Sequence, residues 1–137
     1  VITYRKYDDA GNLIEYETSD GILCAIIWGY NYEYPVAKVI NADFNTAVST
    51  FGSTTYSMLQ ELDGEDLLST LNNIRSALPD AKVVTYDYLP LKGIEKVVDE
   101  NGYSKKYTYD EFGRLIRISD SDGNMLEKFE YKYQSNY

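Results

Sequence analysis

Carboxylates are the side chains of this sequence best able to do chemistry, and several of them lie close together in the chain. Glu61, Asp63, Glu65 and Asp66 form one short run. A glycoside hydrolase needs two carboxyl groups that face each other across a cleft. This run instead stands at the start of a predicted helix, where acidic side chains stabilise the positive end of the helix. Helix capping and solvation therefore explain the run, and we expect the chain not to be an enzyme.

A second group of carboxylates, in the sequence DSDGN, has part of the pattern of a calcium-binding loop. Asp120, Asp122 and Asn124 have the spacing of the first three ligands of such a loop. Met125 occupies the position of the loop glycine, and Tyr131 occupies that of the bidentate glutamate. A hairpin turn accounts for the same residues, so we expect neither a metal site nor a cofactor.

The cysteine and histidine content excludes several kinds of active site. Cys24 is the single cysteine, and there is no histidine. One cysteine cannot form an internal disulfide, and without histidine no Cys–His or Ser–His catalytic pair can exist. Zinc sites built from histidine and cysteine are excluded for the same reason. Because Cys24 lies in the apolar run ILCAIIW, we expect a buried, inert thiol.

Four aromatic residues in the sequence WGYNYEYP are the candidate ligand-binding residues. Trp28, Tyr30, Tyr32 and Tyr34 alternate with other residues, so on a single strand they would share one face. If that face is exposed, it could stack on sugar rings or contact a protein. If helices cover it, the four rings belong to the core or to a self-association surface. The sequence leaves both interpretations open.

Charge and hydropathy indicate which partners to expect. The formal net charge is −9, from 22 acidic and 13 basic residues, and it discourages binding to nucleic acid or anionic membranes. No apolar run approaches the ~20 residues that a membrane-spanning helix needs. We therefore expect a protein partner, or self-association through edge strands, with a glycan as the alternative.

Length and composition favour one globular domain that covers residues 1–137. Hydrophobic residues make up 44% of the 137, which is typical of a folded chain. The chain begins with Val1 instead of Met and has no signal peptide. We interpret it as a processed product or an excised piece of a longer protein.

An internal repeat links the two ends of the chain. Six residues near the start recur near the end at one constant offset: Tyr7, Asp8, Gly11, Leu13, Asp20 and Gly21 correspond to Tyr109, Asp110, Gly113, Leu115, Asp122 and Gly123. A looser third copy contains Tyr88, Gly93, Val97 and Gly102. A period of roughly 20 residues indicates one small supersecondary unit that is used several times.

Each copy carries the turn residues of β-hairpins. An aspartate can accept a hydrogen bond from the backbone N–H two residues later and so begin a turn. A glycine can adopt the positive φ that ends such a turn. The predicted structural turn residues are Asp8, Gly11, Asp20 and Gly21 in the first copy, and Asp110, Gly113, Asp122 and Gly123 in the last.

Between the turns, residues alternate with a period of two, which is typical of antiparallel strands with one solvated face. One face is expected to carry Tyr103, Lys105, Tyr107 and Tyr109, another Val84, Tyr86 and Tyr88, and a third Phe129, Tyr131 and Tyr133. We expect the tyrosines of residues 107–133 to supply the buried face of the hairpin sheet, with their hydroxyls at its rim. Residues 22–28 are apolar on both faces, which predicts a central strand.

Residues 42–80 interrupt the repeats with helical patterns. Asp43 is a possible N-cap for a first helix, and STTYSMLQEL predicts a second short one. The strongest pattern is an apolar stripe of Leu67, Leu68, Leu71, Ile74 and Leu78, which Pro79 ends. A sheet with one amphipathic helical insert over about residues 43–78 predicts a two-layer α+β domain, with the helices packed on one face.

The repeated segments YDDAGNLIEY and YDEFGRLIRISDSDGNMLEKFEYKY resemble the YD repeat of RHS-repeat proteins. Its pattern is roughly Y-D-x-x-G-R-L, then about ten residues to a second glycine and a closing tyrosine. Residues 107–133 fit it closely, including Arg114, whereas Asn12 replaces the arginine in residues 4–23. The segments WGYNYEYPVAKVINA and 77–110 are similar to C-terminal regions of surface or secreted RHS-type proteins of the Bacteroides group.

The resemblance implies a sheet of YD-type hairpins, divided into residues 1–41, the helical insert 42–80, and residues 81–137. It also implies a large exported parent protein at the cell surface or secreted, in a family whose members build β-sheet shells. Two or three units are too few to close a shell, and nothing after Tyr133 could be a toxin. We therefore expect a non-catalytic structural or interaction module, with carbohydrate binding by the Trp28–Tyr34 face as the alternative.

Overall fold

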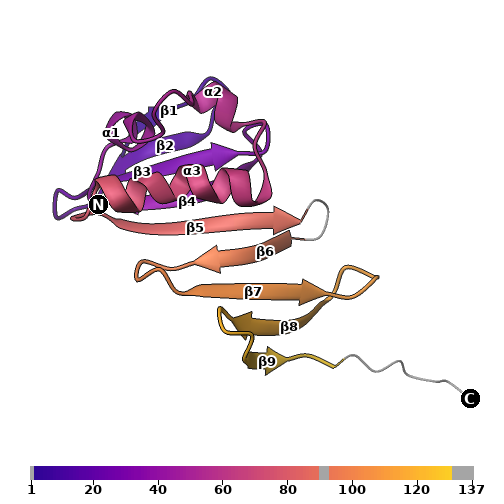
Figure 1. Ribbon diagram of the computed structural model, residues 1–137. Coiled ribbons are helices and arrows are strands. Elements are labelled where there is room, and N and C mark those ends of the chain that lie inside the picture. Colours follow the sequence, from indigo (N-terminus) through magenta and orange to yellow (C-terminus); the bar gives the residue numbers. More distant parts are fainter. Residues whose placement is uncertain (1, 90–92, 131–137) are drawn as a thin grey trace, which may run out of the picture.

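The computed structural model describes residues 2–89 and 93–130, and in this part of the chain one antiparallel sheet runs from end to end (Figure 1). Its strands follow chain order: β1 Thr3–Tyr7, β2 Leu13–Glu17, β3 Leu23–Gly29, β4 Tyr34–Ile40, β5 Lys82–Leu89, β6 Gly93–Val98, β7 Ser104–Tyr109, β8 Leu115–Asp120 and β9 Met125–Lys128. Three helices connect β4 to β5: α1 Phe44–Ser49, α2 Tyr56–Leu59 and α3 Gly64–Ala77.

This architecture confirms the predicted α+β fold of hairpins with a helical insert. The insert runs from the N-cap of α1, Asp43, to the C-cap of α3, Leu78. The helices lie on one face of the sheet, with α1 against β3 and α3 against β5 (Figure 1). The predicted central strand over residues 22–28 is β3, which pairs with β2 and β4.

Local sequence explains where the helices begin. Asp43 accepts a hydrogen bond from the N–H of Thr46 at 2.7 Å, which caps α1. Thr55 caps α2 through the N–H of Met58 at 3.1 Å. The longer α3 has Glu65 in its first turn, where a negative charge is favourable.

The core consists of aliphatic side chains and two phenylalanines between the helices and β2–β5. It contains Ile14, Ala25, Ile27, Val36, Ala37, Val39, Phe44, Ala47, Phe51, Leu59, Leu67, Leu71, Ile74 and Val83. Cys24 is also buried, with 2% of its surface exposed, as its apolar run predicts.

The prediction that tyrosines form the buried face of the sheet is wrong. Among the described residues no tyrosine is fully buried, and Tyr103, which precedes β7, is 69% exposed. In β5 the covered residues are Val83, Thr85 and Asp87, whereas Tyr86 is only half-buried. The physical reason is space, since small side chains let the helices pack closely on the strands, and large rings would hold them away.

The sheet continues well beyond the helices. No residue of β6, β7, β8 or β9 is fully buried, and Figure 1 shows no helix over these strands. This half of the described chain is a single layer with solvent on both faces. Two tyrosines expected on the last strand, Tyr131 and Tyr133, lie outside the described residues.

Candidate functional site

The hairpin turns of the repeat share one hydrogen-bonding pattern. In the turn that begins at Asp110, Oδ1 accepts from the N–H of Phe112 at 2.9 Å and of Arg114 at 3.0 Å. The N–H of Gly113 donates to the carbonyl of Asp110 at 3.0 Å, and Gly113 has a φ of 80°. The aspartate therefore closes the turn with its side chain, and the positive φ favours glycine three residues later.

The same pattern recurs in three other turns that begin with aspartate. Asp8, Asp99 and Asp120 each accept from the backbone N–H groups two and four residues later. The matching glycines, Gly11, Gly102 and Gly123, all have positive φ. The repeat is thus a repeated turn chemistry as well as a repeated sequence.

Two of the predicted turn aspartates are not the residues that accept these hydrogen bonds. Asp20 and Asp122 directly precede Gly21 and Gly123 in the turns. The acceptors are two residues earlier, Thr18 Oγ1 for the N–H of Ile22 at 3.2 Å, and Asp120 for the turn that contains Asp122. Asp8 stands three residues before Gly11, and the same step back from the other turn glycines identifies these acceptors. It also identifies Asp99, which the sequence analysis did not predict as a turn residue.

The DSDGN segment is one of these turns. Oδ1 of Asp120 accepts from two backbone N–H groups, and Oδ2 accepts from Nδ2 of Asn124 at 3.3 Å. Over residues 2–89 and 93–130, no three acidic or cysteine side chains are grouped so that they could hold a metal ion.

The four candidate aromatic residues do not lie on one strand face. Trp28 is in β3 and Tyr34 begins β4, whereas Tyr30 and Tyr32 lie in the turn between these strands. Tyr30, Asn31 and Tyr32 have φ values of 52°, 59° and 66°, so the backbone turns through three left-handed residues. The alternating pattern predicted a strand here, and the structure corrects it to a tight connection.

Long-range hydrogen bonds from Gln60 hold this unusual connection. The side-chain Oε1 of Gln60 accepts from the N–H of Tyr32 at 2.7 Å, and the backbone carbonyl of Gln60 accepts from the N–H of Asn31 at 3.3 Å. Nε2 of Gln60 donates to the carbonyl of Trp28 at 2.7 Å. Left-handed residues other than glycine are uncommon, and here the end of α2 supplies the partners that stabilise them.

Tyr30 and Tyr34 pack on Tyr88 of β5 and form an aromatic cluster. The Tyr34 and Tyr88 rings stack with centroids 4.9 Å apart, and Tyr30 meets both edge-on. The Tyr30 hydroxyl donates to Oδ1 of Asp87, and burial, together with this carboxylate, raises the pKa of Tyr30. Burial raises the pKa of Tyr88 to about 12.

Trp28 and Tyr32 are also engaged within the fold. Nε1 of Trp28 donates to the carbonyl of Leu13 at 2.8 Å, and Tyr32 contacts the Tyr56 ring edge-on at 5.5 Å. Of the four candidates only Tyr34 is exposed, at 37%. The structure therefore brings Tyr30 and Tyr34 together, and places Trp28 and Tyr32 in separate contacts.

Two tyrosine hydroxyls reach across to a neighbouring strand. Tyr88 in β5 donates to the carbonyl of Pro35 in β4 at 2.6 Å, and Tyr109 in β7 donates to the carbonyl of Ile94 in β6 at 2.5 Å. Tyr7 in β1 is the repeat equivalent of Tyr109. The Tyr7 residue is 57% exposed, and its hydroxyl has no hydrogen-bond partner among the described residues.

Both edge strands of the described sheet are open. Every residue of β1 and of β9 is exposed. β1 pairs only with β2, and β9 pairs only with β8. An open edge presents backbone N–H and C=O groups that can pair with another strand.

A buried carboxylate, Glu15, supports the β1 edge, and sequence inspection did not identify it. Its Oε2 accepts from Nε of Arg5 at 3.1 Å, and its Oε1 accepts from the N–H of Phe44 at 2.8 Å. The side chain therefore connects β1, β2 and the first turn of α1. Ile14 and Glu15 are neighbours in β2 and both are buried, so a period of two does not identify Glu15, and its partners come from distant segments.

Comparison with known families now bears on the repeated turns. Residues 94–125 match the family model described as RHS Repeat. This segment is therefore similar to an RHS repeat. The matched segment runs from β6 to the first residue of β9 and contains the turns at Asp99, Asp110 and Asp120. A comparison with curated proteins finds no match.

The segment that matches the RHS Repeat model therefore coincides with the uncovered part of the sheet. Its strands and turns form a structural repeat, and the helical insert lies outside the matched residues. No helix of the described ranges is both long and apolar enough to cross a membrane.

Proposed function

We propose that this chain is a non-catalytic structural and interaction module of a cell-surface or secreted RHS-repeat protein. It uses the repeated hairpins as a scaffold and offers edge strands to a protein partner or to a second copy of the chain. The match of residues 94–125 to the RHS Repeat supports the scaffold role and, in general terms, the location.

The position of Tyr7 carries the interaction role. In β7 the equivalent tyrosine, Tyr109, donates its hydroxyl to the carbonyl of Ile94 in the neighbouring strand. In β1 the same side chain faces solvent next to an open edge. A strand that pairs with β1 would supply both the missing ladder hydrogen bonds and a carbonyl for Tyr7.

The carboxylates support a non-catalytic role. Asp8, Asp99, Asp110 and Asp120 are occupied by backbone N–H groups of their own turns. Glu15 and Asp87, which are buried, are bonded to groups of neighbouring elements. These contacts use the carboxylates as structural acceptors and leave them poorly suited to act as an acid and base pair.

Glycan binding by the four aromatic residues gains little from the geometry. A platform for sugar stacking needs exposed ring faces, and three of the four rings are partly covered by their own contacts. A glycan array probed with wild type and with Tyr34→Ala tests this alternative. Binding by wild type that Tyr34→Ala abolishes would support glycan binding.

Self-association tests the main proposal directly. Light scattering of the wild-type chain from micromolar to millimolar concentration should show a rise in mass, and Tyr7→Phe should shift that rise to higher concentration. Tyr103→Phe is the matched control, because Tyr103 is exposed but lies in a turn. A strict monomer throughout would remove self-association. Backbone amides of β1 that exchange freely in the presence of the whole parent protein would remove edge docking altogether.

A further inference from the structure

The sheet has a second face, opposite the helices, and this back face is apolar in most of its positions. In β5, Val83 and Thr85 are buried on the helix side, so Val84 and Tyr86 point to the back face. Residues that pair across neighbouring strands share a face. The back-face rows therefore contain Ile26, Lys38 and Val84 across β3–β5, and Tyr86, Val97 and Lys105 across β5–β7.

The strands beyond the helices differ in character between their two faces. On the helix side, Lys96, Ser104 and Lys106 are polar and line a pocket with the first turn of α3. On the back face, Tyr107 pairs with Ile118, which carries the apolar surface onto β8. An antiparallel sheet with one polar and one apolar face normally packs the apolar face against another layer.

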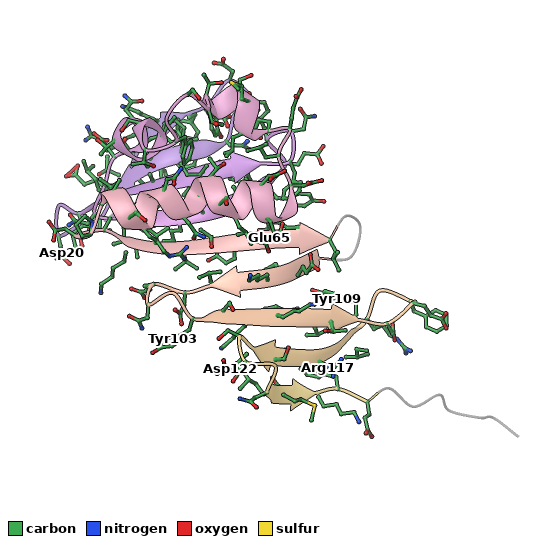
Figure 2. The ribbon with its side chains drawn as sticks, in the orientation of Figure 1. Asp20, Glu65, Tyr103, Tyr109, Arg117 and Asp122 are labelled. Atoms are coloured by element: carbon green, nitrogen blue, oxygen red, sulfur yellow. The ribbon has the colours of Figure 1, made fainter. Side chains whose placement is uncertain are left out.

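No helix covers the back face in the part of the chain that the structure describes. Ala25 and Ile27 of β3 pack under the helices, whereas Ile26, between them, points to the back face and stays partly exposed. A strand that is apolar on both faces is typical of a sheet covered on both sides. Figure 2 shows Glu65 on α3 beside β5, where the helical layer ends, and Arg117 on β8 beyond it. The described sheet therefore lacks a second layer behind it.

The size of the back face fits a second copy of the chain. Tyr16 extends the face to β2, because its partner Cys24 lies on the same side of β3 as Ile26. Strands lie about 4.8 Å apart and rise about 3.4 Å per residue, so the face from β2 to β8 is roughly 29 Å wide and 20 Å long, or about 600 Å². Two such faces together bury about 1,200 Å², which reaches the lower limit for a stable interface.

We propose that the back face is the interface of a two-fold dimer, in which the sheets of two copies pack face to face. Sheets in such a sandwich lie about 10 Å apart, with their strands within about 30° of each other. Two back faces match in size and in apolar character, and a two-fold axis lets each copy cover the other. The stems of Lys38 and Lys105 are apolar, and their ammonium groups reach the rim of the interface. The edges β1 and β9 stay open in this dimer, so it is separate from the proposed edge docking.

Two neighbouring residues of β7 provide matched variants, because Tyr107 points to the back face and Thr108 to the helix side. Both are partly exposed. Sedimentation equilibrium should show the wild-type chain as a dimer at micromolar concentration. Tyr107→Glu should raise the Kd of the dimer by roughly a hundredfold, because an unpaired carboxylate in an apolar interface is costly, and Thr108→Glu should leave it unchanged. Urea unfolding checks that both variants fold. Equal Kd values for the two variants, or a wild-type chain that stays monomeric, would overturn the dimer.

Solvent access to methyl groups tests the same interface without a substitution. In the wild-type chain, a soluble gadolinium chelate should broaden the methyl signals of Ile26, Val84 and Val97 less as the protein concentration rises. The Thr108 methyl signal should stay equally accessible. Back-face methyl groups that remain accessible at concentrations where the mass has doubled would place the contact elsewhere and overturn the proposal.

Tyr7→Phe separates this dimer from pairing at the β1 edge. It should leave the Kd of the dimer unchanged, since Tyr7 lies on the open edge strand. A mass that falls with Tyr7→Phe but not with Tyr107→Glu would overturn the back-face dimer and leave the edge proposal intact. Because each copy carries a net charge of −9, added NaCl should tighten the dimer by screening the repulsion. A dimer that NaCl weakens would indicate an ionic interface and contradict the apolar one.

Discussion

The hydroxyl of Tyr56 in α2 donates a 2.9 Å hydrogen bond to Oδ2 of Asp8, the aspartate that closes the first repeat turn. Asn12 adds a second connection, because its Nδ2 donates both to Oδ2 of Asp8 at 3.2 Å and to the carbonyl of Tyr32 at 2.7 Å. A turn of the repeat, the left-handed connection after β3, and the helical insert therefore meet at one carboxylate.

Removal of the Tyr56 hydroxyl should loosen this junction. Tyr56→Phe keeps the ring contact with Phe44 but loses the hydrogen bond to Asp8. We expect the free energy of unfolding in urea to fall by about 1.5 to 3 kcal/mol, the range for a hydrogen bond to a charged group. Tyr103→Phe should leave it unchanged. Equal unfolding midpoints for wild type and Tyr56→Phe would show that the junction contributes nothing.

Asp110, which closes one of the repeat turns, should make stability depend on acid pH. Hydrogen bonds from the backbone and side chain of Arg114 hold the pKa of Asp110 below its ordinary value of 3.8. Because the folded-state pKa is depressed, the contribution is present above the unfolded-state pKa and is lost as pH falls through the folded-state pKa. Asp110→Asn should therefore be less stable than wild type at neutral pH, and the two should converge in strong acid.

Urea unfolding at a series of pH values measures this difference. Asp122→Asn is the matched control, because the Asp122 carboxylate accepts no hydrogen bond from the described residues, although its N–H donates to Asp120. A constant difference between wild type and Asp110→Asn from neutral to acid pH would contradict the assignment of the turn acceptor.

Arg75 should couple α3 to the start of the uncovered sheet. Its Nη2 donates to the carbonyls of Val83 at 3.0 Å, Val98 at 2.9 Å and Asp99 at 3.2 Å. Arg75→Met keeps the aliphatic stem and leaves these carbonyls without their shared donor. We expect a loss of about 1 to 3 kcal/mol of unfolding free energy.

Arg75→Lys separates charge from geometry, since one ammonium cannot reproduce the planar guanidinium contacts. It should recover only part of the loss. Full recovery with lysine would show that charge alone matters at this position, and an unchanged Arg75→Met would show that the three contacts are dispensable.

The uncovered strands should open more readily than the covered ones. The described residues of β6–β9 are all at least partly exposed, whereas β3 and β4 contain fully buried residues. Local opening costs least where few apolar contacts are lost. Native-state hydrogen exchange should give β7 and β8 amides lower opening free energies than β3 and β4. Uniform protection across the sheet would contradict this division.

Sequence patterns predicted the elements well because their causes are local. Caps such as Asp43 and the stripe of α3 define the helices, and turn glycines such as Gly113 separate strands of the expected period. The spacing between aspartate and glycine follows from hydrogen bonds within five residues, so it can be identified without knowledge of the fold.

The faces of the sheet were harder to predict because they depend on distant segments. The alternating residues of β5 would allow helices to cover either face of the strand. α3 packs against β5, and the face with Val83 and Thr85 is the buried one. The WGYNYEYP segment alternates like a strand, but Gln60, far along the chain, stabilises the turn at Asn31 and Tyr32. The buried Asp87 gave no signal, because the hydroxyl that it accepts comes from Tyr30, in the connection between β3 and β4.

The end of the helical layer at β5 has a mechanical consequence. A load that pulls the two edges of the sheet apart acts across the ladder and separates one strand after another, like a zipper. Rupture begins in the strands without helices, where each step breaks only one pair of strands. It stops at the strands under the helices, where the helices and the sheet must separate together. The uncovered strands β6–β9 are therefore the compliant part of the molecule, and the helix-covered strands are the stiff part. Under tension the hairpins of β6–β9 separate before the covered strands do.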